Sequence, residues 1–372
     1  LHQDRRIGVA GGAGTGKTLL ALMHAKDCAK VGLKTLFLCY NRPLADFLRR
    51  ERESLEAVGE DVEALRIDTF DRFARWWLDE VEHTTGKDFV EMARNDLPSA
   101  DEHEVILPVA LEDALSKHPL AIPYDVVIID EGQDFGDDHW AALNKGLLDR
   151  AGHRCAVFFD SNQAIYRQAK AFPVPAGEIL ELTRNCRNTV PIHEAAYSFY
   201  TGPPEVEASS ISGKNVARWH ANGLRKQANL MVSHISDWVE RGRVQPEQVA
   251  ILLMRNEPVP AEAMGNVKWG SLPEAVRNRL GPAWCSALRA LEKRGLKASV
   301  KSYWKPGRVL IDWVGRYKGL EADIIVLWVN GVPEPHTLNG LRYVGCSRAK
   351  SVLALVGEEA GLATLFPLEL TV

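Results

Sequence analysis

The sequence predicts an α/β fold with two lobes, each built around a parallel central sheet. Its 372 residues are enough for about two or three domains. Short apolar runs alternate with helical patterns along the chain, which is typical of βαβ units. A glycine-rich pattern of the phosphate-binding kind lies between the first apolar run and the first helix.

Four apolar or β-branched runs predict buried strands in the first lobe: Ile7–Ala10, Thr35–Cys39, Asp125–Asp130 and Ala156–Asp160. The segment Lys17–Val31 predicts a helix, because its apolar residues recur at helical spacing and Gly32 follows as a stop.

Five further runs predict the strands of the second lobe: Glu178–Leu182, Val249–Leu253, Val309–Asp312, Ile324–Trp328 and Val352–Val356. Among them, Ala287–Arg294 predicts a helix that Gly295 closes. We therefore expect an N-terminal lobe over residues 1–177 and a C-terminal lobe over residues 178–372.

The composition of the chain argues against several classes of site and of protein. The six cysteines are scattered without a CxxC pair, which argues against zinc or iron–sulfur sites and favours a reduced, cytoplasmic compartment. The longest apolar run, Ile324–Val329, is too short to cross a membrane. A net charge of −4 restricts any nucleic-acid site to a local groove. Because the chain begins at Leu1 without Met, we also expect a missing N-terminal domain or partner.

The run Gly11-Gly12-Ala13-Gly14-Thr15-Gly16-Lys17-Thr18 matches the phosphate-loop pattern at every required position. Its glycines let the backbone curl so that N–H groups face phosphate oxygens at a helix N-terminus. Lys17 is expected to reach the β- and γ-phosphates, and the Thr18 hydroxyl to bind Mg²⁺. The pattern predicts a nucleoside triphosphate site.

A second acidic pattern supports hydrolysis. The predicted strand before Asp130 ends in two acids, Asp130 and Glu131. Asp130 is expected to hold Mg²⁺, and Glu131 to accept a proton from the attacking water. The alternative is an ordinary strand-end turn, but the nearby phosphate loop favours the catalytic interpretation.

With these motifs the chain resembles the superfamily 1 helicases of the UvrD/Rep/PcrA type over nearly all of its length. The segments that carry the resemblance, in chain order, are Asp130–Asp134, Asp160–Tyr166, Asn185–Thr189, Lys318–Asp323 and Tyr343–Ala349. The resemblance implies two RecA-like lobes. It also implies that Gln133 belongs to the nucleotide site, that Gln163 senses the γ-phosphate and that Glu321 contacts the ribose. Arg187 and Arg348 correspond to the two arginine fingers.

Weaker matches at Tyr40–Pro43 and Asp68–Phe73 imply contacts with single-stranded DNA. The residues expected to make these contacts are Asn41, Arg42, Thr69, Phe70 and Tyr166. The alternative for Phe70 and Phe73 is that they belong, with Trp76 and Trp77, to the apolar face of a helix.

The implied function is an ATP-dependent, Mg²⁺-requiring translocase or helicase on single-stranded DNA, moving 3′ to 5′. The inserted subdomains of the relatives are nearly absent here, which favours translocation over extensive unwinding. Cys186 replaces an aromatic residue that stacks on adenine in the relatives, so the preference for ATP over GTP stays open. The alternative function is a nucleotide-gated DNA-binding or recruitment module within a larger nuclease or defence protein.

Overall fold

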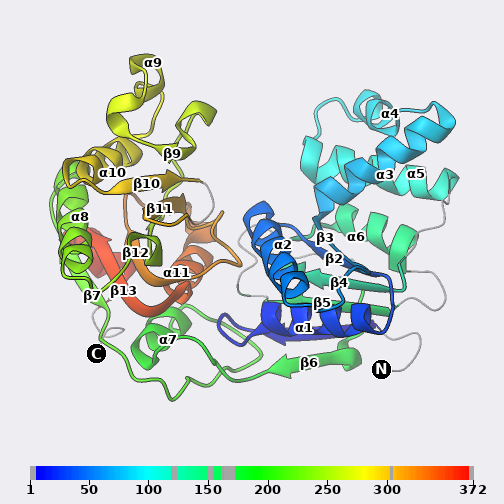
Figure 1. Ribbon diagram of the computed structural model, residues 1–372, viewed down its shortest axis with the longest axis horizontal. Coiled ribbons are helices and arrows are strands. Elements are labelled where there is room, and N and C mark those ends of the chain that lie inside the picture. The colour runs from blue at the N-terminus through cyan, green and yellow to red at the C-terminus, as the bar shows by residue number, and fades with distance from the viewer. Residues whose placement is uncertain are drawn as a thin grey trace. The chain divides into compact units, whose positions relative to one another are not determined.

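The computed structural model describes residues 6–118, 124–148, 154–160, 162, 172–301 and 305–367. The chain divides into two compact units, Leu1–Thr183 and Arg184–Val372, which are considered separately (Figure 1). Both units are α/β, and each contains one central sheet with helices packed on it.

The first unit contains a six-stranded sheet in which all strand pairs are parallel, in the order β3-β2-β4-β5-β1-β6. Its strands are β1 (Arg6–Gly11), β2 (Thr35–Cys39), β3 (Leu65–Thr69), β4 (Val126–Asp130), β5 (Arg154–Phe159) and β6 (Ile179–Leu182). Its α-helices are α1 (Lys17–Lys30), α2 (Arg42–Ala57), α3 (Phe70–Thr85), α4 (Phe89–Asp96), α5 (Leu107–Lys117) and α6 (Asp137–Leu143).

Every residue of β2 and β4 is buried, because helices cover both faces of the sheet. Along β2, Leu36 and Leu38 join the core formed with α3, α5 and α6. The alternate residues Phe37 and Cys39 join the opposite core, formed with α1 and α2. This alternation explains why the central strands are apolar throughout rather than at every second position.

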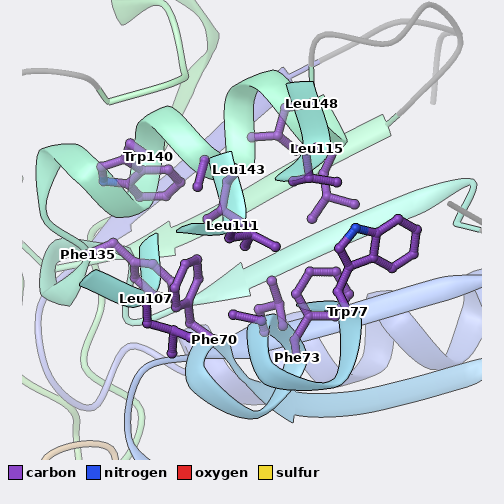
Figure 2. Packing of buried hydrophobic residues seen from close by; sticks show 14 of the residues in the cluster. Phe70, Phe73, Trp77, Leu107, Leu111, Leu115, Phe135, Trp140, Leu143 and Leu148 are labelled. Carbon is purple, nitrogen blue, oxygen red and sulfur yellow. The ribbon is translucent and has the colours of Figure 1, made fainter. Parts of the chain in front are cut away.

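The core beside α3 contains the rings of Phe70, Phe73 and Trp77, packed against side chains of α5 and α6 (Figure 2). Phe70 and Phe73 are fully buried, whereas Trp76 is 38% exposed. The apolar-face interpretation of α3 is therefore confirmed for Phe70, Phe73 and Trp77. The expectation that Phe70 contacts DNA is wrong, because its buried ring has no face left for a base.

The second unit contains a seven-stranded sheet in the order β7-β13-β12-β8-β11-β10-β9, parallel except where β9 pairs with β10. Its strands are β7 (Ala217–His220), β8 (Val249–Leu253), β9 (Gly265–Val267), β10 (Lys297–Val300), β11 (Arg308–Trp313), β12 (Ala322–Trp328) and β13 (Ala349–Gly357). Its α-helices are α7 (Val190–Tyr197), α8 (Leu224–Glu240), α9 (Glu274–Arg277), α10 (Pro282–Lys293), α11 (Leu338–Ser347) and α12 (Glu359–Leu365).

The strands expected from the sequence all form, but one lies in the other sheet. The segment Glu178–Leu182, expected in the second lobe, provides β6, which pairs in parallel with β1. Its residues Leu180 and Glu181 are exposed, as suits an edge strand. The division into units consequently falls after Thr183 rather than before residue 178. Among the described helices, none combines the length and apolarity that a membrane span requires.

The burial of Phe73 in the core beside α3 can be tested by substitution. Phe73→Ala is expected to lower the free energy of unfolding by about 3–5 kcal/mol, because it leaves a cavity in a fully buried site. Phe47→Ala on α2 is the matched control, since the Phe47 ring is 44% exposed, and its effect is expected to stay below about 1 kcal/mol. Urea denaturation followed by tryptophan fluorescence measures both. Similar losses for the two variants would contradict this packing.

Candidate functional site

The predicted phosphate loop connects β1 to α1. Gly14 and Gly16 have positive φ angles of 82° and 89°, a conformation that glycine adopts without strain. Gly16 is the N-cap of α1, so the helix begins with Lys17. The loop therefore ends at a helix N-terminus, where unpaired N–H groups and the helix dipole favour an anion.

Lys17 and Thr15 fix the conformation of this loop. The Nζ of Lys17 donates hydrogen bonds to the carbonyl oxygens of Gly11 at 2.8 Å and Gly12 at 3.0 Å. The Thr15 hydroxyl donates to the Gly12 carbonyl at 2.8 Å. These bonds keep a buried ammonium beside the backbone that a phosphate group would contact.

Asp130 ends β4 and is fully buried. Its Oδ1 accepts a hydrogen bond from the Glu131 N–H at 3.0 Å. No donor among the described residues makes a hydrogen bond to its Oδ2. Burial, and then the charge of Glu131, raise the pKa of Asp130 to about 7, although the Thr18 hydroxyl and the Lys17 ammonium act in the opposite direction.

Glu131 is held in an unusual backbone conformation, with φ 56° and ψ 42°. Left-handed backbone at a residue other than glycine is strained and concentrates at functional sites. The next residue must be small, because a Cβ on Gly132 would lie 2.6 Å from Cγ1 of Val157. The turn thereby presents two acidic side chains in succession at the end of β4.

Gln133 connects this turn to the neighbouring strand. Its Nε2 donates a hydrogen bond to Oε2 of Glu131, and its Oε1 accepts one from the backbone N–H of Asp160 at 2.9 Å. The amide thus fixes the orientation of the Glu131 carboxylate. The sequence placed Gln133 among the nucleotide-binding residues, and the structure gives it this positioning contact as well.

Asp160 is a site residue whose contact with Lys17 the sequence analysis missed. It follows β5, is buried, and has Oδ2 at 3.9 Å from the Lys17 Nζ. The available signal was its place directly after a buried strand, because β5 lies between β4 and β1 in the sheet. The carboxyl ends of these parallel strands reach the same edge.

The chain offers few ligands of its own for a magnesium ion. The described residues contain no group of three or more His, Cys, Asp or Glu side chains placed to hold a metal ion. Further ligands would therefore have to come from nucleotide phosphates and water, as is usual for Mg²⁺. Asp130 Oδ2 is a buried oxygen without a hydrogen bond, and oxygen atoms are the ligands that Mg²⁺ prefers. Thr18 and Asp130 are therefore the residues that could hold the ion.

The second unit brings three of its predicted segments together. Arg187 NH1 lies 2.6 Å from Oε2 of Glu321, and its NH2 donates to the Ser347 carbonyl at 2.8 Å. Lys350 Nζ lies 2.7 Å from the other oxygen of Glu321. Burial alone would raise the pKa of Glu321, but Arg187 and Lys350 together hold that pKa below its ordinary value.

Arg348 is buried beside this cluster. Its Nε donates to the Val344 carbonyl at 3.3 Å, and its NH2 lies 3.2 Å from the Ser347 hydroxyl. Arg187 is the more accessible of the two predicted arginine fingers, since 21% of its side chain is exposed. Both side chains use protein oxygens as partners in this structure.

The expected DNA-binding residues fall into three groups. Arg42 is exposed, and Asn41, the N-cap of α2, is partly exposed. Thr69 is buried and caps α3 by accepting a hydrogen bond from the Arg72 N–H at 3.2 Å, which gives its hydroxyl a structural role. Gln163 and Tyr166, expected near the γ-phosphate and the DNA, lie outside the described residues.

A search against protein-family models and a search of curated proteins both find no match for this chain. Function must therefore be inferred from the residues themselves. The first unit combines a phosphate loop, a buried acid without a hydrogen bond on one oxygen and a second acid held by a glutamine. This arrangement can bind a triphosphate and activate water beside it.

The two acids at the end of β4 predict how the free energy of unfolding changes with pH. Because the pKa of Asp130 is raised to about 7 in the folded chain, well above that of an ordinary aspartate, its ionisation destabilises the fold as pH rises toward about 7. Glu131→Gln removes the neighbouring charge and is expected to raise the free energy of unfolding at pH 8 by about 1 kcal/mol. The gain should disappear near pH 4, because Asp130, whose pKa is raised to about 7, is then protonated and no longer repels the Glu131 charge.

Urea denaturation at both pH values measures this gain. Glu63→Gln is the control, because it removes an equal charge from an exposed position of the same unit. Its effect is expected to stay within about 0.5 kcal/mol. A loss of stability in Glu131→Gln at pH 8 would contradict the predicted repulsion.

Proposed function

We propose that this protein is an ATP hydrolase of the superfamily 1 helicase type, with two RecA-like lobes, that translocates on single-stranded DNA. The observation that carries the proposal is that the Lys17 loop, the Asp130–Glu131 turn and Asp160 follow the adjacent parallel strands β1, β4 and β5, with the Lys17 Nζ 3.9 Å from Asp160 Oδ2. The order of the motifs along both units supports the same assignment.

In this proposal the phosphate loop binds the triphosphate, and Lys17 exchanges its carbonyl partners for β- and γ-phosphate oxygens. Thr18 and Asp130 would hold Mg²⁺, which when bound would supply charge neutralisation for the transferred phosphoryl group. Glu131 accepts the proton of the attacking water, and Gln133 keeps the carboxylate oriented for that transfer.

The second unit contains the two proposed arginine fingers. Arg187 and Arg348 retain the proposed role of neutralising charge in the transition state, an effect worth about 10³–10⁵ in rate. Each side chain would then give up protein oxygens, the Glu321 carboxylate for Arg187 and backbone carbonyls for Arg348. Glu321, released from Arg187, would become available to the ribose. Hydrolysis would thereby be coupled to rearrangement within the second unit.

Glu131→Gln tests the proposed base. The variant is expected to bind ATP with Mg²⁺ but to hydrolyse it at least about 100-fold more slowly, because the amide cannot accept the proton. Phosphate release and binding of a fluorescent ATP analogue measure the two steps separately. Glu63→Gln should match the unaltered protein in both. Normal turnover in Glu131→Gln would exclude Glu131 as the base.

The role of DNA is tested by ATP turnover with and without single-stranded DNA. A translocase is expected to hydrolyse ATP at least about tenfold faster with DNA. This increase corresponds to an activation barrier lowered by roughly 1.4 kcal/mol. A nucleotide-gated binding module would bind DNA in a nucleotide-dependent way without this acceleration. Turnover that is insensitive to DNA, with no nucleotide-dependent DNA binding, would contradict both functions. GTP in place of ATP determines whether Cys186 permits either base.

A further inference from the structure

A pocket of about 460 Å³ lies beside the edge strand β3, between α2 and α3 of the first unit. This volume is within the range of about 300–1,000 Å³ that is usual for ligand sites. The residues that give it its character are four arginines, one carboxylate and an indole: Arg49, Arg52, Arg66, Arg72, Asp68 and Trp76. Glu53 also lines it, so cations outnumber acids in a chain whose net charge is −4.

Two of the arginines already have structural roles. Arg49 donates to the Ile67 carbonyl at 3.0 Å and also pairs with Asp46. Arg52 donates to the Leu65 carbonyl at 2.9 Å, and its NH1 lies 3.3 Å from Oε2 of Glu56. Both guanidinium groups thus donate hydrogen bonds to backbone carbonyls on the open edge of β3. These carbonyls are then not available to pair with an added peptide strand.

The other two arginines, Arg66 and Arg72, both pair with Asp68. Asp68 accepts hydrogen bonds from Arg49 at 3.1 Å and Arg66 at 2.9 Å, and it lies 3.3 Å from Nε of Arg72. One buried carboxylate is therefore shared by three guanidinium groups. The Arg72 side chain is 66% exposed, so it can turn its outer N–H groups toward an anion.

Trp76 supplies a flat surface beside these cations. The Arg66 guanidinium lies over the Trp76 ring, 4.0 Å from the ring centroid. The indole is 38% exposed on a helix whose Phe73 and Trp77 rings are buried. An exposed indole next to guanidinium groups is the combination that binds a stacked base and its phosphate.

We infer that this pocket binds one nucleotide unit of a single-stranded nucleic acid, with the base on Trp76 and the phosphate on Arg72 and Arg66. The choice of a polynucleotide rests on the proposed function. The exposed position of Arg72 and Trp76 also suits a chain that continues past the pocket on both sides. The site adds to the strand contacts expected at Asn41 and Arg42, and it replaces the buried Phe70 as a stacking surface.

Binding of a fluorescein-labelled oligothymidylate of about 20 nucleotides to the full chain, measured by anisotropy, tests the inference. Trp76→Ala is expected to weaken binding by between about 5-fold and 150-fold, and Trp76→Phe to restore most of the affinity. Arg72→Ala should lower the salt dependence, the slope of log affinity against log salt, by about 0.7–1. Arg94→Ala is the control, since Arg94 is exposed and paired with Glu102.

Each alternative outcome has a distinct meaning. If the unaltered protein binds no single-stranded nucleic acid, both the proposed function and this inference are overturned. If it binds, but Arg72→Ala and Trp76→Ala bind equally well, only this inference is overturned. Competition by thymidine monophosphate as effective as by the oligonucleotide would indicate a mononucleotide site and overturn the polymer assignment. Equally effective competition by polyglutamate would indicate a general anion site and overturn the inference.

Discussion

In the first unit, β1, β4 and β5 are adjacent parallel strands, so their carboxyl ends meet at one edge of the sheet. The whole candidate site depends on this register. Lys17 follows β1, Asp130 ends β4 and Asp160 follows β5, which brings residues far apart in the chain into contact distance. An antiparallel neighbour would place its end residues at the opposite edge, and the charges would not meet.

This arrangement is unfavourable by itself. Two successive acids are buried at the end of β4, and Glu131 adopts a backbone conformation that is strained by roughly 1–3 kcal/mol. The packed cores on both faces of the sheet can sustain such a site, because they fix β4 independently of the turn. The two buried acids at the end of β4 are thus held together at the expense of stability, which is typical of sites built to bind an ion or a substrate.

Much of the fold could be predicted, because buried parallel strands appear as continuous apolar runs and the phosphate loop has a fixed pattern. The error over β6 has a physical cause: an edge strand with exposed residues does not show which sheet it joins. The burial of Phe70 and Arg348 could not be predicted either. A motif specifies residue types, but it does not say whether a ring or a guanidinium group is exposed to solvent. Asp160 was quoted as part of a motif, but its distance to Lys17 follows only from strand order.

The distribution of charge matters more here than its sum. A net charge of −4 argues against a polyanionic partner only if charges act over the whole molecule. At physiological ionic strength they are screened within about 8 Å, so a ligand responds to the groups that surround its own site. The buried acids at the ends of β4 and β5 then favour cations, Lys17 beside Asp160 among them, whereas the guanidinium groups around Asp68 favour a phosphate. One mildly acidic chain can in this way carry two sites of opposite local charge, and nucleic-acid binding is compatible with its composition.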